Sequence, residues 1–132
     1  MARNTSPAKG TPWQVVVEES ERLIPALGNY PSLERVTVGT FTYPEPGCRD
    51  ARLSVSITDK RFFNSSAKGF SKGVILHLYV LGISELFLNI SGMEASIIIE
   101  RESRTEIKGF GNFAFRMECD AVVLADFAAF KG

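Results

Sequence analysis

The sequence has few of the residues that build metal sites and disulfide frameworks. It contains one histidine and two cysteines, Cys48 and Cys119, among its 132 residues. A zinc site needs several His and Cys ligands at short spacings, and a calcium loop needs several oxygen ligands within about a dozen residues. The sequence offers neither pattern, so we expect no metal and no cofactor. Whether Cys48 and Cys119 form one disulfide stays open.

Charge of one sign and long apolar runs are also lacking. Lys+Arg 15 balances Asp+Glu 15, which gives a formal net charge of +0. Proteins that bind nucleic acid usually carry a basic excess, so we expect no nucleic-acid partner. The longest apolar run, residues 74–83, contains His77 and Gly82 and is much shorter than a membrane span. With no apolar signal segment at the start, the sequence predicts a cytoplasmic protein without a membrane partner.

The residues that are present fit one globular domain. Hydrophobic residues make up 45% of the chain and charged residues 23%, which is ordinary for a folded protein. Residues 1–12 are rich in Ser, Thr, Pro and Gly and are expected to form a flexible N-terminal tail. The predicted domain therefore spans residues 13–132. A net charge of zero gives little repulsion between two copies of the chain. Whether the protein forms a homodimer through an exposed sheet edge is therefore an open question.

One helix is predicted over residues 13–27. Apolar residues recur at helical spacing from Val16 onward. Pro25 is expected to kink or end the helix, and Gly28 suits its C-terminal end. The β-branched run at residues 15–17 instead favours a strand.

After Pro31 the apolar pattern changes from a period of 3.6 to a period of 2, which is typical of strands. About seven strands are expected, over residues 36–43, 52–58, 74–81, 86–90, 95–99, 113–117 and 122–124. Ser91-Gly92 and the glycine-containing segment 108–112 are expected to be turns. Short links between strands predict an α+β fold, mostly an antiparallel β-sheet or sandwich with one N-terminal helix packed on it.

His77 is the one candidate for acid–base catalysis. It stands in the middle of a predicted strand, and no local motif supplies a nucleophile and an orienting acid. We expect a strand histidine that is hydrogen-bonded to a neighbour, and no enzyme. An enzyme with an unusual site that joins His77 to Asp50 or Glu85 is the alternative.

Cations and aromatics alternate in the Lys60–Lys72 loop, the one local pattern that favours nucleic-acid or anion binding. A loop whose phenylalanines fold back onto the core explains the same pattern, and we favour that interpretation. Whether this loop binds anything stays open.

Two acidic sets are the candidate partner-binding residues, because acidic surfaces attract basic partners. One set lies on the predicted helix and the other mainly on predicted strand positions of one parity. The six residues are Glu18, Glu19, Glu21, Glu100, Glu102 and Glu106.

The stretch from Leu27 to Val38 resembles the head of the bacterial immunity protein 50 family, which belongs to polymorphic toxin systems. The likeness is carried by the Tyr30-Pro31-Ser32 turn, which follows a helix and precedes a strand. The order of the later apolar strands is similar too. That family often has His-Asp-Ala after the serine, where this chain has Leu33-Glu34-Arg35, so any role tied to that histidine does not carry over.

The resemblance implies an antitoxin that neutralises one cognate toxin domain by protein–protein interaction. Such a protein needs a complementary surface and no catalysis, and acidic residues would suit the basic cleft of a nuclease toxin. The main alternative is a small ligand-binding β domain. Its apolar pocket would be lined by residues such as Phe113, Phe115 and Tyr79.

Overall fold

The computed structural model describes residues 12–42, 49–58 and 73–130. The predicted tail (except Pro12), Cys48 and the Lys60–Lys72 loop lie outside these residues. In the described ranges, no helix combines the length and apolar character needed to cross a membrane.

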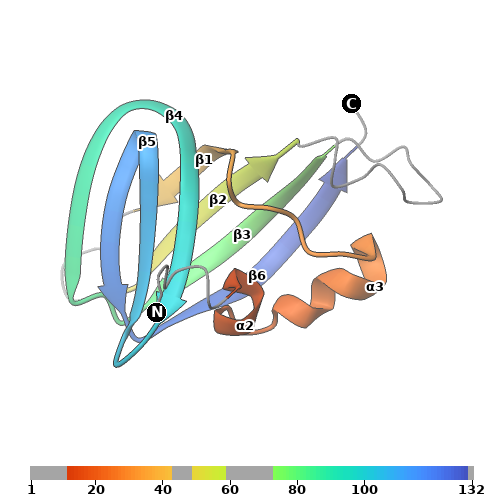
Figure 1. The fold of residues 1–132 in the computed structure, drawn as a ribbon, viewed down its shortest axis with the longest axis horizontal. Helices are drawn as coiled ribbons and strands as arrows, with labels where there is room; N and C mark the ends of the chain where they lie inside the picture. Colours follow the sequence, from red (N-terminus) through yellow and green to blue (C-terminus); the bar gives the residue numbers. More distant parts are fainter. Residues whose placement is uncertain (1–11, 43–48, 59–72, 131–132) are drawn as a thin grey trace, which may run out of the picture.

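The main element is a curled, antiparallel, six-stranded sheet with the order β5-β4-β1-β2-β3-β6, preceded by short helices (Figure 1). This architecture confirms the predicted α+β class. The strands are β1 (Val36–Thr42), β2 (Ala51–Ile57), β3 (Gly73–Leu81), β4 (Glu85–Arg101), β5 (Thr105–Cys119) and β6 (Ala121–Phe130).

The sheet has six strands where about seven were expected, because Ser91-Gly92 is not a turn. These residues lie inside the single strand β4, at an irregularity where residues 91–94 face only Asn112 of β5. A Cβ atom at Gly92 would lie 2.8 Å from the Asn112 Cβ, so the missing side chain permits this close approach. The chain therefore bends at this point without leaving the sheet.

The predicted turn at residues 108–112 is also wrong, since these residues lie inside β5. Gly111 has φ +124°, a conformation that residues with a side chain rarely adopt, and it marks the bend of β5. Gly109 faces the ring of Phe115 so closely that a Cβ atom would collide with it. The β4–β5 hairpin thus folds over on itself into the arch of Figure 1.

The predicted single helix is broken into three short pieces: α2 (Trp13–Val16), the 3-10 helix η2 (Ser20–Arg22) and α3 (Leu23–Leu27). Between the first two, the Glu18 N–H donates to the Val122 carbonyl and the Leu124 N–H donates to the Glu18 carbonyl, both at 2.9 Å. These hydrogen bonds hold Glu18 in an extended conformation beside β6, so the helix does not continue through it. The β-branched run at residues 15–17 had indicated this strand-like character.

Of the two predictions for the end of the helical region, the one for Gly28 is confirmed, whereas the one that Pro25 kinks or ends the helix is wrong. Gly28 closes α3 with φ +80°, and its N–H donates to the Ile24 carbonyl at 2.7 Å. Pro25 stands in the first turn of α3, where its missing N–H costs no helical hydrogen bond.

The core lies between the inner faces of the curled sheet and is closed by the N-terminal helices. Alternate residues of every strand point into it, as the period-2 pattern predicts. The largest fully buried side chains include Leu23, Leu53, Ile57, Leu76, Leu78, Ile99, Ile107, Met117 and Leu124.

Candidate functional site

The outward side chains of β4 and β5 form a charged surface that we call the hairpin face. Its members occupy the positions that alternate with the buried ones, and several lie opposite one another across the two strands. They are Glu85, Phe87, Ile98, Glu100, Glu106, Lys108, Phe110, Arg116 and Glu118.

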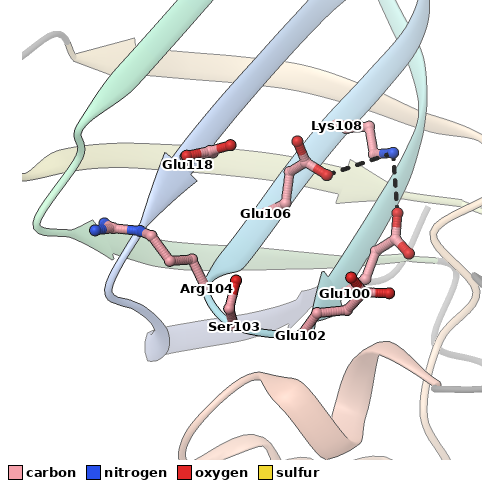
Figure 2. A pocket seen from close by; sticks show the side chains of 7 residues that line it. All are labelled: Glu100, Glu102, Ser103, Arg104, Glu106, Lys108 and Glu118. Atoms are coloured by element: carbon pink, nitrogen blue, oxygen red, sulfur yellow. Dashed lines mark ion pairs between the residues drawn. The ribbon is translucent and has the colours of Figure 1, made fainter.

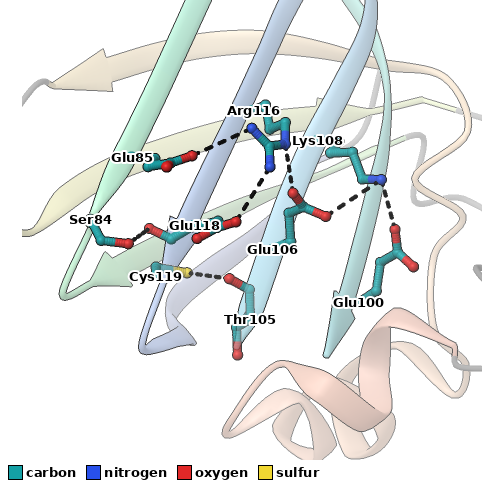
Figure 3. Close-up of polar contacts among 9 residues, drawn as sticks. All are labelled: Ser84, Glu85, Glu100, Thr105, Glu106, Lys108, Arg116, Glu118 and Cys119. Atoms are coloured by element: carbon teal, nitrogen blue, oxygen red, sulfur yellow. Dashed lines mark hydrogen bonds and ion pairs between the residues drawn. The ribbon is translucent and has the colours of Figure 1, made fainter. Parts of the chain in front are cut away.

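Arg116 is the centre of one half of the hairpin face. Its guanidinium donates to Glu106 Oε2 at 2.6 Å and to Glu118 Oε2 at 3.3 Å, and it lies 3.6 Å from Glu85 Oε1 (Figure 3). Glu106 and Arg116 belong to the same strand but to opposite sides of its bend. Figure 3 shows the two arms of β5 side by side, so the arch brings these two residues together.

Lys108 continues the network toward β4. Its ammonium lies 3.0 Å from Glu100 Oε2 and 3.5 Å from Glu106 Oε1. Glu100 and Glu106 are direct cross-strand partners, and their like charges would repel without Lys108. One chain of ion pairs therefore runs across the whole hairpin face, from Glu85 to Glu100.

The two cations respond to these neighbours. The hydrogen bond to Glu100, together with the charges of Glu100 and Glu106, raises the pKa of Lys108 against a smaller opposing effect of burial. The hydrogen bond to Glu106 and its charge raise the pKa of Arg116. Both side chains therefore stay charged at every physiological pH.

A hollow of about 340 Å³ lies beside the network, next to the turn that joins β4 to β5 (Figure 2). Four glutamates and two basic residues line it, which leaves an excess of two negative charges. The lining residues are Glu100, Glu102, Ser103, Arg104, Glu106, Lys108 and Glu118.

Large apolar side chains stand exposed on the same hairpin. Phe87 is 58% exposed and Phe110 is 52% exposed, and both belong to the hairpin face. Ile90 and Met93 of β4 are also exposed, close to the bend. Aromatic side chains beside charged groups are a composition typical of protein-binding surfaces.

The structure brings some of the predicted partner-binding residues together. Glu100 and Glu106 share Lys108, and Glu102 lies in the adjoining turn. Glu18, Glu19 and Glu21 lie on the separate N-terminal segment and are exposed. The second acidic set is therefore part of a ladder of mixed charge, in which Glu100 and Glu106 are paired with Lys108 and Glu102 is not paired with a described cation.

Sequence reasoning missed the two cations that organise this ladder. Lys108 and Arg116 share the parity of Glu106 and Glu118, and this alternation was the available signal. Nothing in the sequence shows that residues 106 and 116 meet, because only the bend of β5 places them side by side.

His77 is a hydrogen-bonded strand histidine, as predicted. Its Nδ1 atom lies 2.8 Å from the Ser54 hydroxyl oxygen on the neighbouring strand β2. Neither residue of the catalytic alternative contacts it. Asp50 accepts a hydrogen bond from the Gly82 N–H, and Glu85 pairs with Arg116.

The predicted apolar pocket does not form from the three residues named for it. Phe113 and Phe115 are buried in the core, where their rings pack edge to face at 5.8 Å. Tyr79 lies on the opposite face of the sheet, beside Arg52. Phe113 and Phe115 occupy strand positions that point into the core, whereas Tyr79 occupies a position that points outward. Because all three are large aromatic residues, the sequence pattern does not show this difference.

Cys119 is a buried free thiol whose Sγ lies 3.6 Å from the Thr105 carbonyl oxygen. Desolvation by burial raises the pKa of this thiol to about 11. It is therefore protonated at neutral pH and is no nucleophile. Within the described residues, no group of three or more His, Cys, Asp or Glu side chains is arranged to hold a metal ion.

Comparison of the chain with family models, characterised proteins and solved structures finds no match.

Proposed function

We propose that this protein binds another protein through the hairpin face. The observation that supports the proposal best is the coexistence of two exposed phenylalanines, Phe87 and Phe110, with an ordered ion-pair network on one surface. Aromatic side chains are enriched at protein interfaces, where a few buried residues carry most of the binding energy, and charged surroundings give specificity and a fast encounter.

The partner that suits this surface has a basic patch. The hollow beside the network carries an excess of negative charge, and Glu102 in the turn makes no ion pair with a described residue. Because the other glutamates are held by Lys108 and Arg116, their positions are fixed before a partner arrives. Preorganised groups lose less conformational entropy on binding.

The resemblance to the immunity protein 50 family gives the proposal a concrete form. The partner would be a bacterial toxin domain, and this protein would neutralise it by covering its basic cleft. No catalytic step by this chain is involved. The protein would act in the cytoplasm, where a toxin must be blocked before it damages its producer.

The direct test is co-purification with the product of the adjacent gene. We expect that product to be toxic when expressed alone, harmless when expressed with this protein, and recovered with it as a stable complex. A neighbour that is neither toxic nor bound would contradict the immunity form of the proposal.

The two acidic sets provide a matched pair of variants for that complex. Replacing Glu100, Glu102 and Glu106 by Gln removes the hairpin charges, and replacing Glu18, Glu19 and Glu21 by Gln removes the same number elsewhere. We expect the first variant to weaken binding about tenfold or more, because close interfacial charge pairs commonly couple by more than ~1.5 kcal/mol. The second should bind within about twofold of the parent. Equal losses from both would show that the two acidic sets share the interface, and an unchanged affinity of the first variant would place the interface away from the hairpin charges.

A further inference from the structure

The outer face of the sheet carries a second hollow, which is separate from the hairpin face. Its volume is about 480 Å³, within the range of small-molecule sites. We call it the sheet hollow. It is lined by Thr40, Thr42, Arg52, Leu53, Ser54, His77, Leu78, Tyr79, Ala125 and Asp126.

One cross-strand row forms the middle of the sheet hollow. The partners Thr40, Ser54, His77 and Asp126 lie side by side across β1, β2, β3 and β6. The two strands at the ends of this row, β1 and β6, are irregular next to it. β1 shifts its register between Val38 and Thr40, and β6 shifts its register opposite His77 and Leu78. Bulges bend a sheet and redirect side chains, and they are frequent beside functional sites.

Arg52 stands in the next row with a geometry that suits an anion. Its guanidinium lies 5.2 Å from the centre of the Tyr79 ring, so stacking holds it in place. No carboxylate of the described residues pairs with it. A guanidinium that is fixed in place and has no acidic partner can bind a carboxylate or phosphate through two hydrogen bonds.

The surrounding groups have hydrogen-bonding capacity to spare. Ser54 occupies Nδ1 of His77, which leaves the Nε2 atom for a ligand whichever tautomer is present. The hydroxyls of Thr40 and Thr42 make no hydrogen bond with the described residues. Asp126 accepts one hydrogen bond, from the Phe127 N–H at 2.8 Å, and can accept others.

We propose that the sheet hollow binds a small organic anion that also carries hydroxyl groups, such as a hydroxycarboxylate or a phosphate ester. Arg52 holds the anionic oxygens together with the threonine hydroxyls. His77 and Asp126 bind the hydroxyl groups of the ligand at the other end. This role is independent of the partner-binding proposal, because it uses neither the hairpin nor a second protein.

The test is a titration of the folded, full-length protein followed by amide chemical shifts in NMR. The probes are glycerate and glycerol 3-phosphate, with glycerol as the uncharged control. We expect saturable shifts at Ser54, His77 and Tyr79 with at least one anion at millimolar concentrations, and none with glycerol. Comparison of the two anions decides between carboxylate and phosphate. Absence of saturation with both anions, or equal binding of glycerol, would overturn the proposal.

Two variants identify the groups responsible. Arg52→Gln should weaken anion binding about tenfold or more, the effect of losing a charge-assisted contact. Arg35→Gln, an exposed arginine outside the hollow, should leave it unchanged. Asp126→Asn should weaken binding of the hydroxylated anions relative to inorganic phosphate, which has no such hydroxyl groups to lose and gains from the removal of a like charge. Binding that survives Arg52→Gln in a protein with an unchanged melting temperature would overturn the assignment.

Discussion

The hairpin face and the sheet hollow are both polar, but their charged groups are used in opposite ways. On the hairpin face, Lys108 and Arg116 each contact at least two glutamates. In the sheet hollow, Arg52 contacts an aromatic ring and no described carboxylate. Paired charges make an ordered surface, which suits the protein partner that we propose, whereas an arginine without an acidic partner has hydrogen bonds available for the proposed ligand. The difference teaches that polar composition alone does not define a site.

The largest effect on stability should come from placing a side chain at Gly109, where there is no room for one. This change would disrupt the hairpin face and leave the sheet hollow intact. A side chain there collides with the Phe115 ring, and the Phe113 carbonyl oxygen lies 3.0 Å from the Cβ position. We expect Gly109→Val to lower the free energy of unfolding by about 3 kcal/mol, measured in urea.

Gly39→Val is the matched control, because its Cβ would meet only the Ser54 carbonyl oxygen at 3.9 Å. Its effect should stay within about 0.5 kcal/mol. Equal losses for both variants would show that the arch does not depend on the close approach at Gly109.

The next effect concerns pH and the buried thiol beneath the hairpin. The pKa of Cys119 is raised from 9.0 to about 11, so the unfolded chain loses this proton first as the pH rises. The stability contributed by Cys119 is therefore full below pH 9 and falls between pH 9 and 11, by about 2–3 kcal/mol. Unfolding curves of the parent and of Cys119→Ala should converge over this interval. Parallel curves would contradict the assignment.

A smaller effect is expected in the sheet hollow. Ser54→Ala removes the hydrogen bond to His77 and leaves the half-buried imidazole nitrogen without its protein partner. We expect a loss of about 1 kcal/mol in the free energy of unfolding, and no change at the hairpin face. An unchanged stability would mean that water replaces the hydroxyl fully.

The smallest effect should come from Lys108→Met on the hairpin face. The ion pairs of Lys108 lie at the surface with their side chains only partly exposed, and surface pairs of this kind contribute about 0.2–1 kcal/mol. Because the pKa of Lys108 is raised, its contribution is full below pH 10.5 and is lost as the pH rises through the folded-state pKa. The loss should also shrink in high salt. An effect insensitive to salt would point to packing of the lysine stem instead.

The strands of the sheet could be predicted from the sequence, because a half-buried strand has apolar and polar residues in alternation along its own length. Leu53, Val55 and Ile57 alternate with polar residues, and the structure places all three in the core. The hydrogen-bonded state of His77 was predicted too. Its partner Ser54 was not, since strand register is set by contacts distant in sequence.

The bends and the break in the helix could not be predicted, because each depends on a long-range contact. In the sequence, the glycines at 109 and 111 are typical of a turn. Only the structure shows that Gly109 makes room for the Phe115 ring and that both glycines pair with β4. The helix breaks at Glu18 because its backbone bonds to β6, more than a hundred residues away. The meeting of Glu106 with Arg116 follows from the same bend of β5.

The central claim, that the hairpin face binds a protein partner, is tested most directly by its two exposed phenylalanines. The measurement is the affinity of the Phe87→Ala and Phe110→Ala variants for the partner recovered by co-purification, with the exposed Val15→Ala as control. We predict that at least one phenylalanine variant weakens binding by about 2 kcal/mol or more, with an unchanged melting temperature. The control should bind like the parent. Full affinity of both phenylalanine variants would contradict the claim and place the interface on another face.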